Sequence, residues 1–597
     1  QLTRFFESTL EEYTKWLELY DQHQRDKITS IEGLNFPFDE YREGQYTFMG
    51  AVYQTLMSKD ILYSIAPTGI GKTIASLYSS LKTIKDETEK IFYLTAKNAG
   101  KKIAVDTINL LKDKGLVCKT VVINSKEAMC QMDTVDCDPD ICPYAKGYYD
   151  RLKEALNDIF IHQDVYDMKL IKDYGEYHKI CPHEFSLSIS NFSDLVICDY
   201  NYVFDPRTHL IRYFEEEYYS PKLLIDEAHN MVDRSRNMYS SSLQRETLIE
   251  LKKATSKIKP SPRSSIKKLI DYIDEFVENN EIKKARFYYQ EEMDYEFLKY
   301  VDRIVNKIDQ ILSENKKFDT RKKVLECYFE LLQFTRISEY YNEDYKYVVE
   351  EVNGDIRITE LCLDASKYIL DVIERRASGT IFFSATLDPL DYYVQLITNK
   401  EGKSIRIPSP FKQKNLGLFV EGTTSTRYKD RDRSVERILD TIYGMLETKV
   451  GNYIVFFPSY KYMSMVLEEF DLTEYETFVQ ERNMSQRQRS KMLEEFSKKA
   501  EASKIGFFVL GGSFSEGIDY VGDMLNGVLV IGVAMPQFNQ YNELLRSHFD
   551  EKFDSGFDYA YTYPGMNKVV QAVGRVIRTE EETGIAILFD DRYLHRK

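Results

Sequence analysis

The chain has 597 residues, with 80 Lys and Arg against 96 Asp and Glu, which gives a formal net charge of −16. Hydrophobic residues make up 43% of it, enough for several buried cores, so a largely disordered chain is excluded. The acidic balance excludes a protein coated in basic charge but leaves room for a local basic channel. The longest uncharged run, residues 524–542, contains Asn, Gln and Pro and does not predict a membrane span. Since no leader sequence opens the chain, a cytoplasmic protein is expected.

Short runs rich in Val, Ile, Leu, Phe and Tyr recur in two groups along the chain. The first group comprises residues 60–66, 90–95, 195–198, 222–225 and 380–383, and the second comprises 453–457, 505–510, 527–532 and 584–589. Such runs predict strands that are buried on both faces, as in parallel sheets. The fold class is therefore predicted as α/β, with two α/β domains.

Two long stretches interrupt the first predicted domain. Six of the eight cysteines fall between positions 118 and 198, and residues 106–191 show no obvious sheet pattern. In a cytosolic protein this crowding indicates a metal or a cluster rather than disulfides. Residues 233–376 are charged and Tyr-rich, with Leu and Ile at helical spacing, and predict a mostly helical insertion.

The strongest chemical signal is Ala-Pro-Thr-Gly-Ile-Gly-Lys-Thr at positions 66–73, between a predicted strand and a predicted helix. Gly69 and Gly71 allow backbone N–H groups to surround a phosphate at the positive end of the helix. Lys72 is expected to reach the β and γ phosphates, and the Thr73 hydroxyl is expected to bind Mg²⁺. The spacing is that of a phosphate loop, although Ala replaces the usual first Gly.

A second signal is Leu-Leu-Ile-Asp-Glu-Ala-His at positions 223–229, where an apolar strand ends in two carboxylates. Asp226 is expected to hold Mg²⁺, and Glu227 to orient or deprotonate the attacking water. His229 could link this site to other domains. Paired acids are common in so acidic a chain, but together with the phosphate loop they indicate hydrolysis of a nucleoside triphosphate.

A third signal lies near the C-terminus, where Gln571, Arg575 and Arg578 are spaced to share one helical face. Two arginines on a rigid face suit bidentate contact with a γ-phosphate. A salt-bridged surface helix is the alternative, which the apolar flanks disfavour. The distance from the phosphate loop in the sequence predicts a nucleotide held between two domains.

Taken in order, these motifs resemble the XPD/DinG branch of the superfamily 2 helicases, from about residue 36 to the C-terminus, with positions 226–229 matching the DEAH box. Further segments resemble the branch's glutamine motif (42–45), first strand-contacting motif (94–97), coupling motif (384–386), interdomain linker (408–411), fourth motif (456–459) and fifth motif (515–519). The resemblance implies two RecA-like domains, with an iron–sulfur insertion and a helical arch insertion in the first. The implied boundaries are 1–29 for an N-terminal helical linker; 30–105, 192–232 and 377–405 for the first RecA-like domain; 106–191 for the iron–sulfur domain; 233–376 for the arch; and 406–597 for the second RecA-like domain.

The resemblance also assigns individual residues. ATP and Mg²⁺ are expected at Gln45, Thr68, Gly69, Gly71, Lys72, Thr73, Asp226 and Asp519. The implied catalytic residues are Lys72, Asp226, Glu227, Gln571, Arg575 and Arg578. Contacts to DNA are expected at Thr95, Lys97, Tyr144, Tyr149, Asn201, Ser459 and Glu516. Tyr144 and Tyr149 belong to a strip of alternating aromatic and basic side chains that could stack bases, or that could equally be a partly buried helix.

The resemblance implies a 4Fe–4S cluster, for which the matching ligands are Cys130, Cys137, Cys142 and Cys181. Their spacings of six, four and thirty-eight intervening residues lack the close pair that is common in zinc sites. Zinc remains an alternative, and Cys118 could replace Cys130 as the first ligand. The other cysteines, Cys198, Cys327 and Cys362, are expected to be structural.

The function implied is that of an ATP-dependent DNA helicase that moves 5′ to 3′ on one strand and opens duplexes, in DNA repair or recombination. Single-stranded and tailed duplex DNA are the expected partners, no membrane is involved, and a monomer is expected. One alternative is a single-strand translocase, or the motor module of a nuclease, that does not separate duplexes. Another is a metal-binding adaptor with ATP as a switch, which the presence of Glu227 and Arg575 disfavours. The N-terminal helix could be part of a linker to a nuclease domain.

Overall fold

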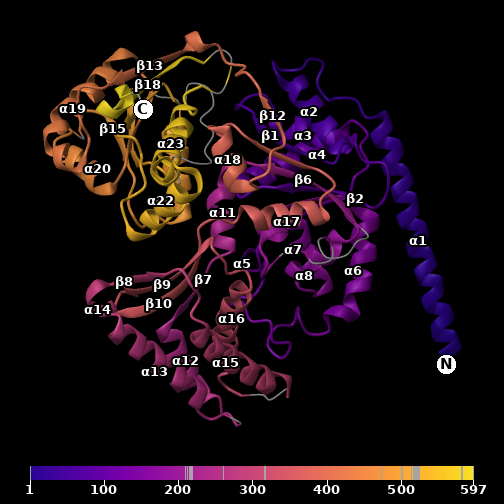
Figure 1. Cartoon of the computed structure of the whole chain (residues 1–597). Coiled ribbons are helices and arrows are strands. Elements are labelled where there is room, and N and C mark those ends of the chain that lie inside the picture. Colours follow the sequence, from indigo (N-terminus) through magenta and orange to yellow (C-terminus); the bar gives the residue numbers. More distant parts are fainter. Residues whose placement is uncertain are drawn as a thin grey trace.

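The computed structural model describes residues 2–595, except for positions 209, 211–212, 214–218, 260, 315–317, 472, 499–501, 513, 515–524, 578 and 580–581. These residues form two parallel β-sheets and one antiparallel sheet, each covered by helices (Figure 1). Within this part of the chain, no helix combines the length and apolarity needed to cross a lipid bilayer.

The first sheet has eight parallel strands in the order β12-β1-β11-β6-β2-β5-β3-β4. Its strands are β1 (Ile61–Ile65), β2 (Glu89–Leu94), β3 (Thr120–Val122), β4 (Val165–Tyr166), β5 (Leu195–Cys198), β6 (Ser220–Asp226), β11 (Thr380–Ser384) and β12 (Lys403–Arg406). Helices α2 (Gln45–Met57), α3 (Lys72–Leu81) and α4 (Asn98–Asp113) pack on one face. Helices α11 (Met231–Met238), α17 (Ser366–Arg376) and α18 (Leu390–Ile397) pack on the other. Both faces of the sheet are thus buried, as the apolar runs predict.

The stretch 106–191 contributes to this sheet, which the sequence did not indicate. Strands β3 and β4 extend its edge next to β5. They have three and two residues, too short to produce a recognisable apolar pattern. The remaining elements of this stretch are helices: α5 (Lys126–Met129), α6 (Tyr148–His162), α7 (Met168–His178) and α8 (Pro182–Ser190), with the short α9 (Asn201–Phe204) after β5.

The arch insertion contains the expected helices and also an antiparallel sheet that was not predicted. The helices are α12 (Arg245–Ala254), α13 (Arg263–Asn279), α14 (Ile282–Ala285), α15 (Tyr295–Ser313) and α16 (Arg321–Ser338). The strands are β7 (Ser241–Gln244), β8 (Phe287–Gln290), β9 (Tyr345–Val352) and β10 (Asp355–Cys362), in the order β7-β10-β9-β8. The turn between β9 and β10 is Asn353-Gly354, with φ of 54° and 84°. An Asn-Gly pair between apolar runs is a strong hairpin signal, which the helical interpretation overlooked.

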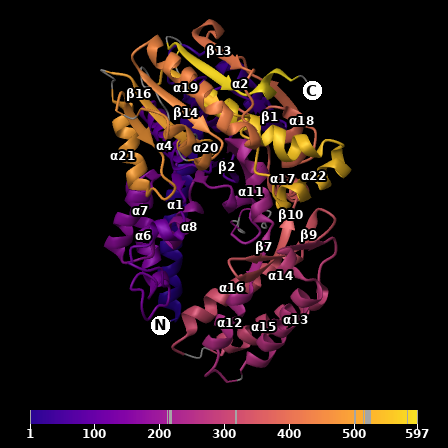
Figure 2. The same ribbon diagram turned by 90° about the vertical axis from the view of Figure 1, so that its left-hand side faces the viewer.

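The second parallel sheet has six strands in the order β13-β18-β17-β14-β16-β15. They are β13 (Leu416–Glu421), β14 (Asn452–Phe457), β15 (Glu476–Val479), β16 (Lys504–Val509), β17 (Gly527–Ile531) and β18 (Gly584–Phe589). The accompanying helices are α19 (Arg431–Thr448), α20 (Tyr460–Leu467), α21 (Gln486–Ser497), α22 (Gln540–Phe553) and α23 (Tyr563–Val573). Seen from the side, helices α6–α8 and helices α12–α16 form two separate projections beside the sheets (Figure 2).

Helix α1 (Leu2–Gly33) extends along the first sheet, and its N-terminal end reaches beyond the body of the molecule (Figure 1). Its C-terminal half is anchored: Lys27 and His23 contact the buried Asp194 carboxylate at 3.1 and 2.8 Å. Burial alone would raise the pKa of Asp194, but Lys27 and His23 outweigh it and hold that pKa below its usual range. Ile31 joins the core of the first sheet. A linker role for residues 1–29 therefore fits only the exposed first half of α1.

Replacing Lys27 with Met is expected to lower the free energy of unfolding by about 3 kcal/mol, because a buried carboxylate loses a cation. Trp16, the single Trp of the chain, packs edge-on against Phe160 at 5.0 Å, so its fluorescence follows this contact in urea. Lys15→Met, on the exposed half of the same helix, is the control. It should leave the urea concentration at the midpoint of unfolding unchanged. Equal midpoints for both variants would contradict the anchoring role of Asp194.

Helix α22 packs one of its faces against the arch sheet. That face presents Tyr541, Leu544, Leu545, His548 and Lys552. The Tyr541 hydroxyl donates to Glu350 Oε1 at 2.6 Å, and Leu544 is buried against Val348 and Leu363. The second sheet is thus attached to the arch by apolar and polar contacts together.

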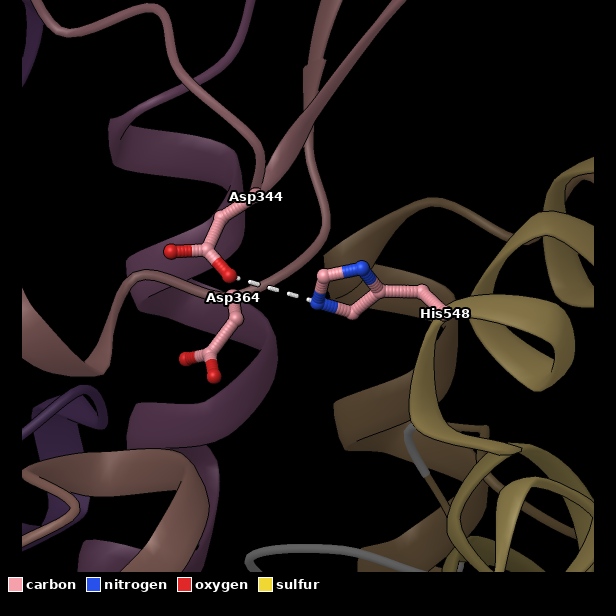
Figure 3. A group of neighbouring side chains, drawn as sticks. All are labelled: Asp344, Asp364 and His548. Carbon is pink, nitrogen blue, oxygen red and sulfur yellow. Dashed lines mark ion pairs between the residues drawn. The ribbon is translucent and has the colours of Figure 1, made fainter. Parts of the chain in front are cut away.

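At the polar end of this contact two carboxylates, Asp344 and Asp364, lie beside His548, which pairs with Asp344 (Figure 3). Among the described residues, Asp344, Asp364 and His548 are the one group of possible metal ligands whose atoms lie within 4.8 Å of one another. The Lys552 ammonium contacts Asp344 at 2.9 Å and Asp364 at 2.7 Å, so a protein cation already neutralises them. Burial would raise the pKa of Asp344, but His548 and Lys552 outweigh it and lower that pKa to about 2. The cluster is therefore an ion-pair contact between the arch and α22.

Candidate functional site

The segment 66–71 connects β1 to α3 as a phosphate loop would. The Ala66 N–H donates to Ser384 O at 2.8 Å, and Gly69 and Gly71 have φ of 86° and 75°. Only Gly adopts these values without strain. A Cβ at Gly71 would come within 2.6 Å of the Gln45 amide nitrogen, so this buried glutamine lies directly against the loop. The predicted strand–loop–helix arrangement of the loop is present.

The two acidic residues lie where β6 ends, at the same edge of the sheet as the loop. Asp226 is 9% exposed, and Glu227 follows it with a φ of 50°, in the left-handed region. Burial and the adjacent Glu227 charge raise the pKa of Asp226. Burial would also raise the pKa of Glu227, but His229 and Lys72 outweigh it and lower that pKa. Glu227 therefore remains ionised at neutral pH.

His229 connects these carboxylates to both sheets. Its Nδ1 lies 2.8 Å from Ser384 Oγ and 3.4 Å from Glu227 Oε2. Its Nε2 lies 3.0 Å from the Gln571 amide nitrogen of α23, which belongs to the second sheet. When that amide donates to Nε2, the neutral ring carries its proton on Nδ1 and donates it to Ser384 or Glu227. A chain of hydrogen bonds thus links the acidic pair to the second sheet. His229 therefore connects the site to another domain, as the sequence suggested.

A cavity of about 380 Å³ lies between the two parallel sheets. Its wall includes Thr68, Asp226 and Glu227 from the first sheet and Gln571 and Arg575 from the second. Arg575 is 9% exposed, so its guanidinium is held among protein groups rather than in bulk solvent. The structure therefore brings residues that were predicted to bind the nucleotide or to catalyse its hydrolysis together at one cavity, from both sheets.

Among the predicted site residues, Arg578, Asp519 and Glu516 lie outside the described residues. Lys72 begins α3, and its Nζ lies 3.4 Å from Pro67 O, folded back over the loop.

The predicted DNA contacts do not form one group. Thr95 is 1% exposed and, like Lys97, lies in the wall of the 380 Å³ cavity. Ser459 caps α20 by accepting from the Tyr462 N–H at 3.4 Å. Asn201 lies in a separate cavity of about 810 Å³ at the carboxyl ends of β2, β3 and β5.

That larger cavity also contains basic residues that the sequence did not single out, among them Lys101 and Arg234. Arg234 donates to Asn201 Oδ1 at 2.6 Å and also pairs with Asp199, while Lys101 lies in the first turn of α4 and donates to Ile123 O at 2.9 Å. Basic groups at the ends of parallel strands suit the binding of an anionic chain.

The aromatic strip divides into exposed and buried parts. Tyr149 is 84% exposed. Tyr148 is only 8% exposed and packs into the core on the α11 face of the first sheet. Tyr144 donates its hydroxyl to Glu176 Oε2, and this hydrogen bond raises the pKa of Tyr144 to about 12. Tyr149 is thus the exposed aromatic member of the strip, and its ring meets the Tyr148 ring edge-on at 5.2 Å.

The four cysteines expected to act as ligands surround a third cavity, of about 240 Å³. They are Cys130, Cys137, Cys142 and Cys181. Cys118 instead lies in the apolar core on the other face of the sheet, where burial raises its pKa to about 12. Cys198, Cys327 and Cys362 are buried in apolar cores, as expected for structural cysteines.

Comparison with known proteins agrees with this geometry. Residues 86–248 match the DEAD_2 family, and residues 442–597 match the helicase C-terminal domain family. ATP-dependent DNA helicase CHL1 of Debaryomyces hansenii is 22% identical over 72% of the chain. The helicase subunit XPD of the general transcription and DNA repair factor IIH of Dictyostelium discoideum is 22% identical over 94% of it. The chain thus carries a DEAD_2 domain and a helicase C-terminal domain, and the predicted resemblance to the XPD/DinG-type superfamily 2 helicases is confirmed.

The chain spans 59% of the CHL1 relative and 86% of the XPD relative. A solved XPD helicase structure superposes with a TM-score of 0.63 over 94% of this chain and 97% of that one, at 19% identity. This shows the fold of the branch, with two RecA-like domains, and the two parallel sheets described above are those domains.

Proposed function

We propose that this chain is an ATP-dependent DNA helicase that moves 5′ to 3′ on single-stranded DNA and separates duplexes, in DNA repair or recombination. The observation that carries the proposal is the His229 hydrogen-bond chain, which joins Glu227 to Gln571 across two RecA-like domains. A motor needs such a link, because hydrolysis in one domain must move the other. The names of the CHL1 and XPD relatives support the same activity. The domain boundaries given above and a monomeric state belong to the proposal.

In this proposal, ATP would occupy the cavity between the domains, and a bound Mg²⁺ would supply positive charge to its phosphates. The loop backbone and Lys72 hold the β and γ phosphates, while Thr73 and Asp226 hold the metal ion. Glu227 takes a proton from the attacking water, and Arg575 neutralises the charge that develops on the γ-phosphate. The hydrogen bonds of His229 would transmit a change in the protonation or position of Glu227 to Gln571 in the second domain. Closure around ATP and release after hydrolysis would alternate a DNA contact at Asn201 in the first domain with one at Ser459 in the second.

A single-strand translocase without unwinding is the second candidate, because the same motor geometry serves both. An ATPase assay beside a strand-displacement assay separates them. Turnover stimulated by single strands together with duplex opening supports the helicase. Turnover without opening supports the translocase, and no turnover at all contradicts both.

A 4Fe–4S cluster held by Cys130, Cys137, Cys142 and Cys181 is part of the proposal. Tetrahedral zinc would need thiolate sulfurs about 3.8 Å apart. Among the described residues, no three of these sulfurs lie within 4.8 Å of one another, yet all four thiols border one cavity. Four thiols around one cavity suit a cubane cluster, which needs four thiolate ligands. When bound, the cluster would rigidify the insertion that faces the arch.

Cys142→Ser is expected to abolish iron binding, because a cubane cluster loses one of its four thiolates. Iron and acid-labile sulfide per chain, measured after anaerobic purification, check this outcome. Cys118→Ser is the matched control and should keep the wild-type iron content. Zinc in the wild-type protein, or loss of iron only in the Cys118 variant, would contradict the ligand set.

A further inference from the structure

Tyr93 lies beneath the nucleotide site without belonging to the sequence motifs. It is on β2, which pairs with β6, and its side chain is fully buried at 0% exposure. Its hydroxyl donates to Asp226 Oδ2 at 2.9 Å and lies 3.3 Å from Thr73 Oγ1. The phenol carries the O–H of the bond to Asp226, because an ionised carboxylate only accepts hydrogen bonds. One phenol therefore contacts both residues to which the proposed function assigns the metal ion.

The hydrogen bonds fix the orientation of the Asp226 carboxylate. Its Oδ2 accepts from Tyr93, and its Oδ1 accepts from the Glu227 backbone N–H at 3.0 Å. Each carboxylate oxygen keeps a second lone pair for another partner. The Tyr93 oxygen can also accept from Thr73, which would leave lone pairs of the threonine hydroxyl facing away from the strand. Thr73 on the loop and Asp226 on β6 are thus held relative to each other by a single buried group.

We propose that Tyr93 is a positioning residue for the Mg²⁺–nucleotide complex, acting through the Asp226 carboxylate and the Thr73 hydroxyl. This inference rests on the proposed function, because it presupposes that the cavity takes a nucleotide with its metal ion. Groups that orient metal ligands typically change metal affinity by about 10- to 100-fold when they are removed. A purely structural tyrosine would change stability without changing how nucleotide binding depends on Mg²⁺.

The test compares Tyr93→Phe with Tyr63→Phe. Both residues are fully buried in the first sheet, and the Tyr63 hydroxyl bonds to Thr398 and Lys400 O instead of the site. Each substitution removes one buried hydroxyl and keeps the ring, so the two variants should have similar melting temperatures. The readout is the dissociation constant of a fluorescent ATP analogue, measured in EDTA and across a Mg²⁺ titration, which requires no turnover.

Tyr93→Phe is expected to bind the nucleotide as the wild type does in EDTA, but to need about 10-fold more Mg²⁺ for the half-maximal gain in affinity. Tyr63→Phe should follow the wild type throughout. A Mg²⁺ dependence that is unchanged in Tyr93→Phe, or equally shifted in both variants, overturns the inference. So does a wild type whose nucleotide binding ignores Mg²⁺. A wild type that binds Mg²⁺–nucleotide normally but does not hydrolyse it overturns the proposed function and leaves this test intact.

Discussion

Glu227→Gln is expected to lower the kcat of single-strand-stimulated ATP hydrolysis by about 10³-fold, because a positioned general base is removed. Glutamine keeps the volume of the side chain and can still bond to Ser384, whose hydroxyl lies 3.2 Å from Glu227 Oε2. It cannot accept a proton from water at neutral pH. Nucleotide affinity should therefore stay near the wild-type value while turnover falls, which single-turnover kinetics and equilibrium binding measure separately.

A matched variant keeps this experiment specific. Glu296 lies in the first turn of α15 in the arch, exposed and paired with Lys299, so Glu296→Gln removes an equal charge away from the cavity. Its turnover should equal that of the wild type. Turnover retained within a few-fold in Glu227→Gln would contradict the assignment of the base.

Arg575→Ala is expected to lower kcat by about 10³-fold, because an arginine supplied across a domain boundary stabilises charge on the transferring phosphoryl group. Helix α23 ends at Val573, so the prediction that Arg575 shares one helical face with Gln571 is wrong; Arg575 follows the helix and lines the 380 Å³ cavity together with Asp226 and Glu227. Arg575→Lys should recover little of the loss, since an ammonium lacks the planar fork of the guanidinium. Rapid-quench measurement of γ-phosphate release at saturating ATP checks both variants.

Arg546 supplies the control for this second result. It lies on α22 of the same domain and pairs only locally, with Glu543 at 3.0 Å. Arg546→Ala should hydrolyse ATP at the wild-type rate. If Arg575→Ala did the same, the second domain would take no part in catalysis, and a site shared between the domains would be wrong.

The parts of the site that the sequence predicts are those that a continuous segment determines. The phosphate loop needs its glycines, and the end of β6 needs an apolar run followed by acids, so both can be recognised locally. The position of Gln571 beside His229 depends on packing between domains more than three hundred residues apart in the sequence. Tyr93 is missed for the same reason, since its pattern is that of any buried strand residue.

The fold was predictable to a similar extent. Long apolar runs give the parallel strands, whereas the two short strands β3 and β4 form only because β5 offers an edge to pair with. The antiparallel sheet of the arch could have been predicted in part, because the Asn353-Gly354 turn of its hairpin is recognisable in the sequence. The ion pair between Lys27 and Asp194 could not be found from sequence, as nothing local distinguishes a buried lysine from an exposed one.

The most direct test of the central claim is strand displacement by anaerobically purified protein with ATP and Mg²⁺, on duplexes that carry either a 5′ or a 3′ single-stranded tail. We expect the 5′-tailed duplex to open, the 3′-tailed duplex to stay closed, and Glu227→Gln to open neither. Opening of the 3′-tailed duplex alone would contradict the proposed direction. ATP hydrolysis with neither duplex opened would contradict the helicase itself and leave a translocase.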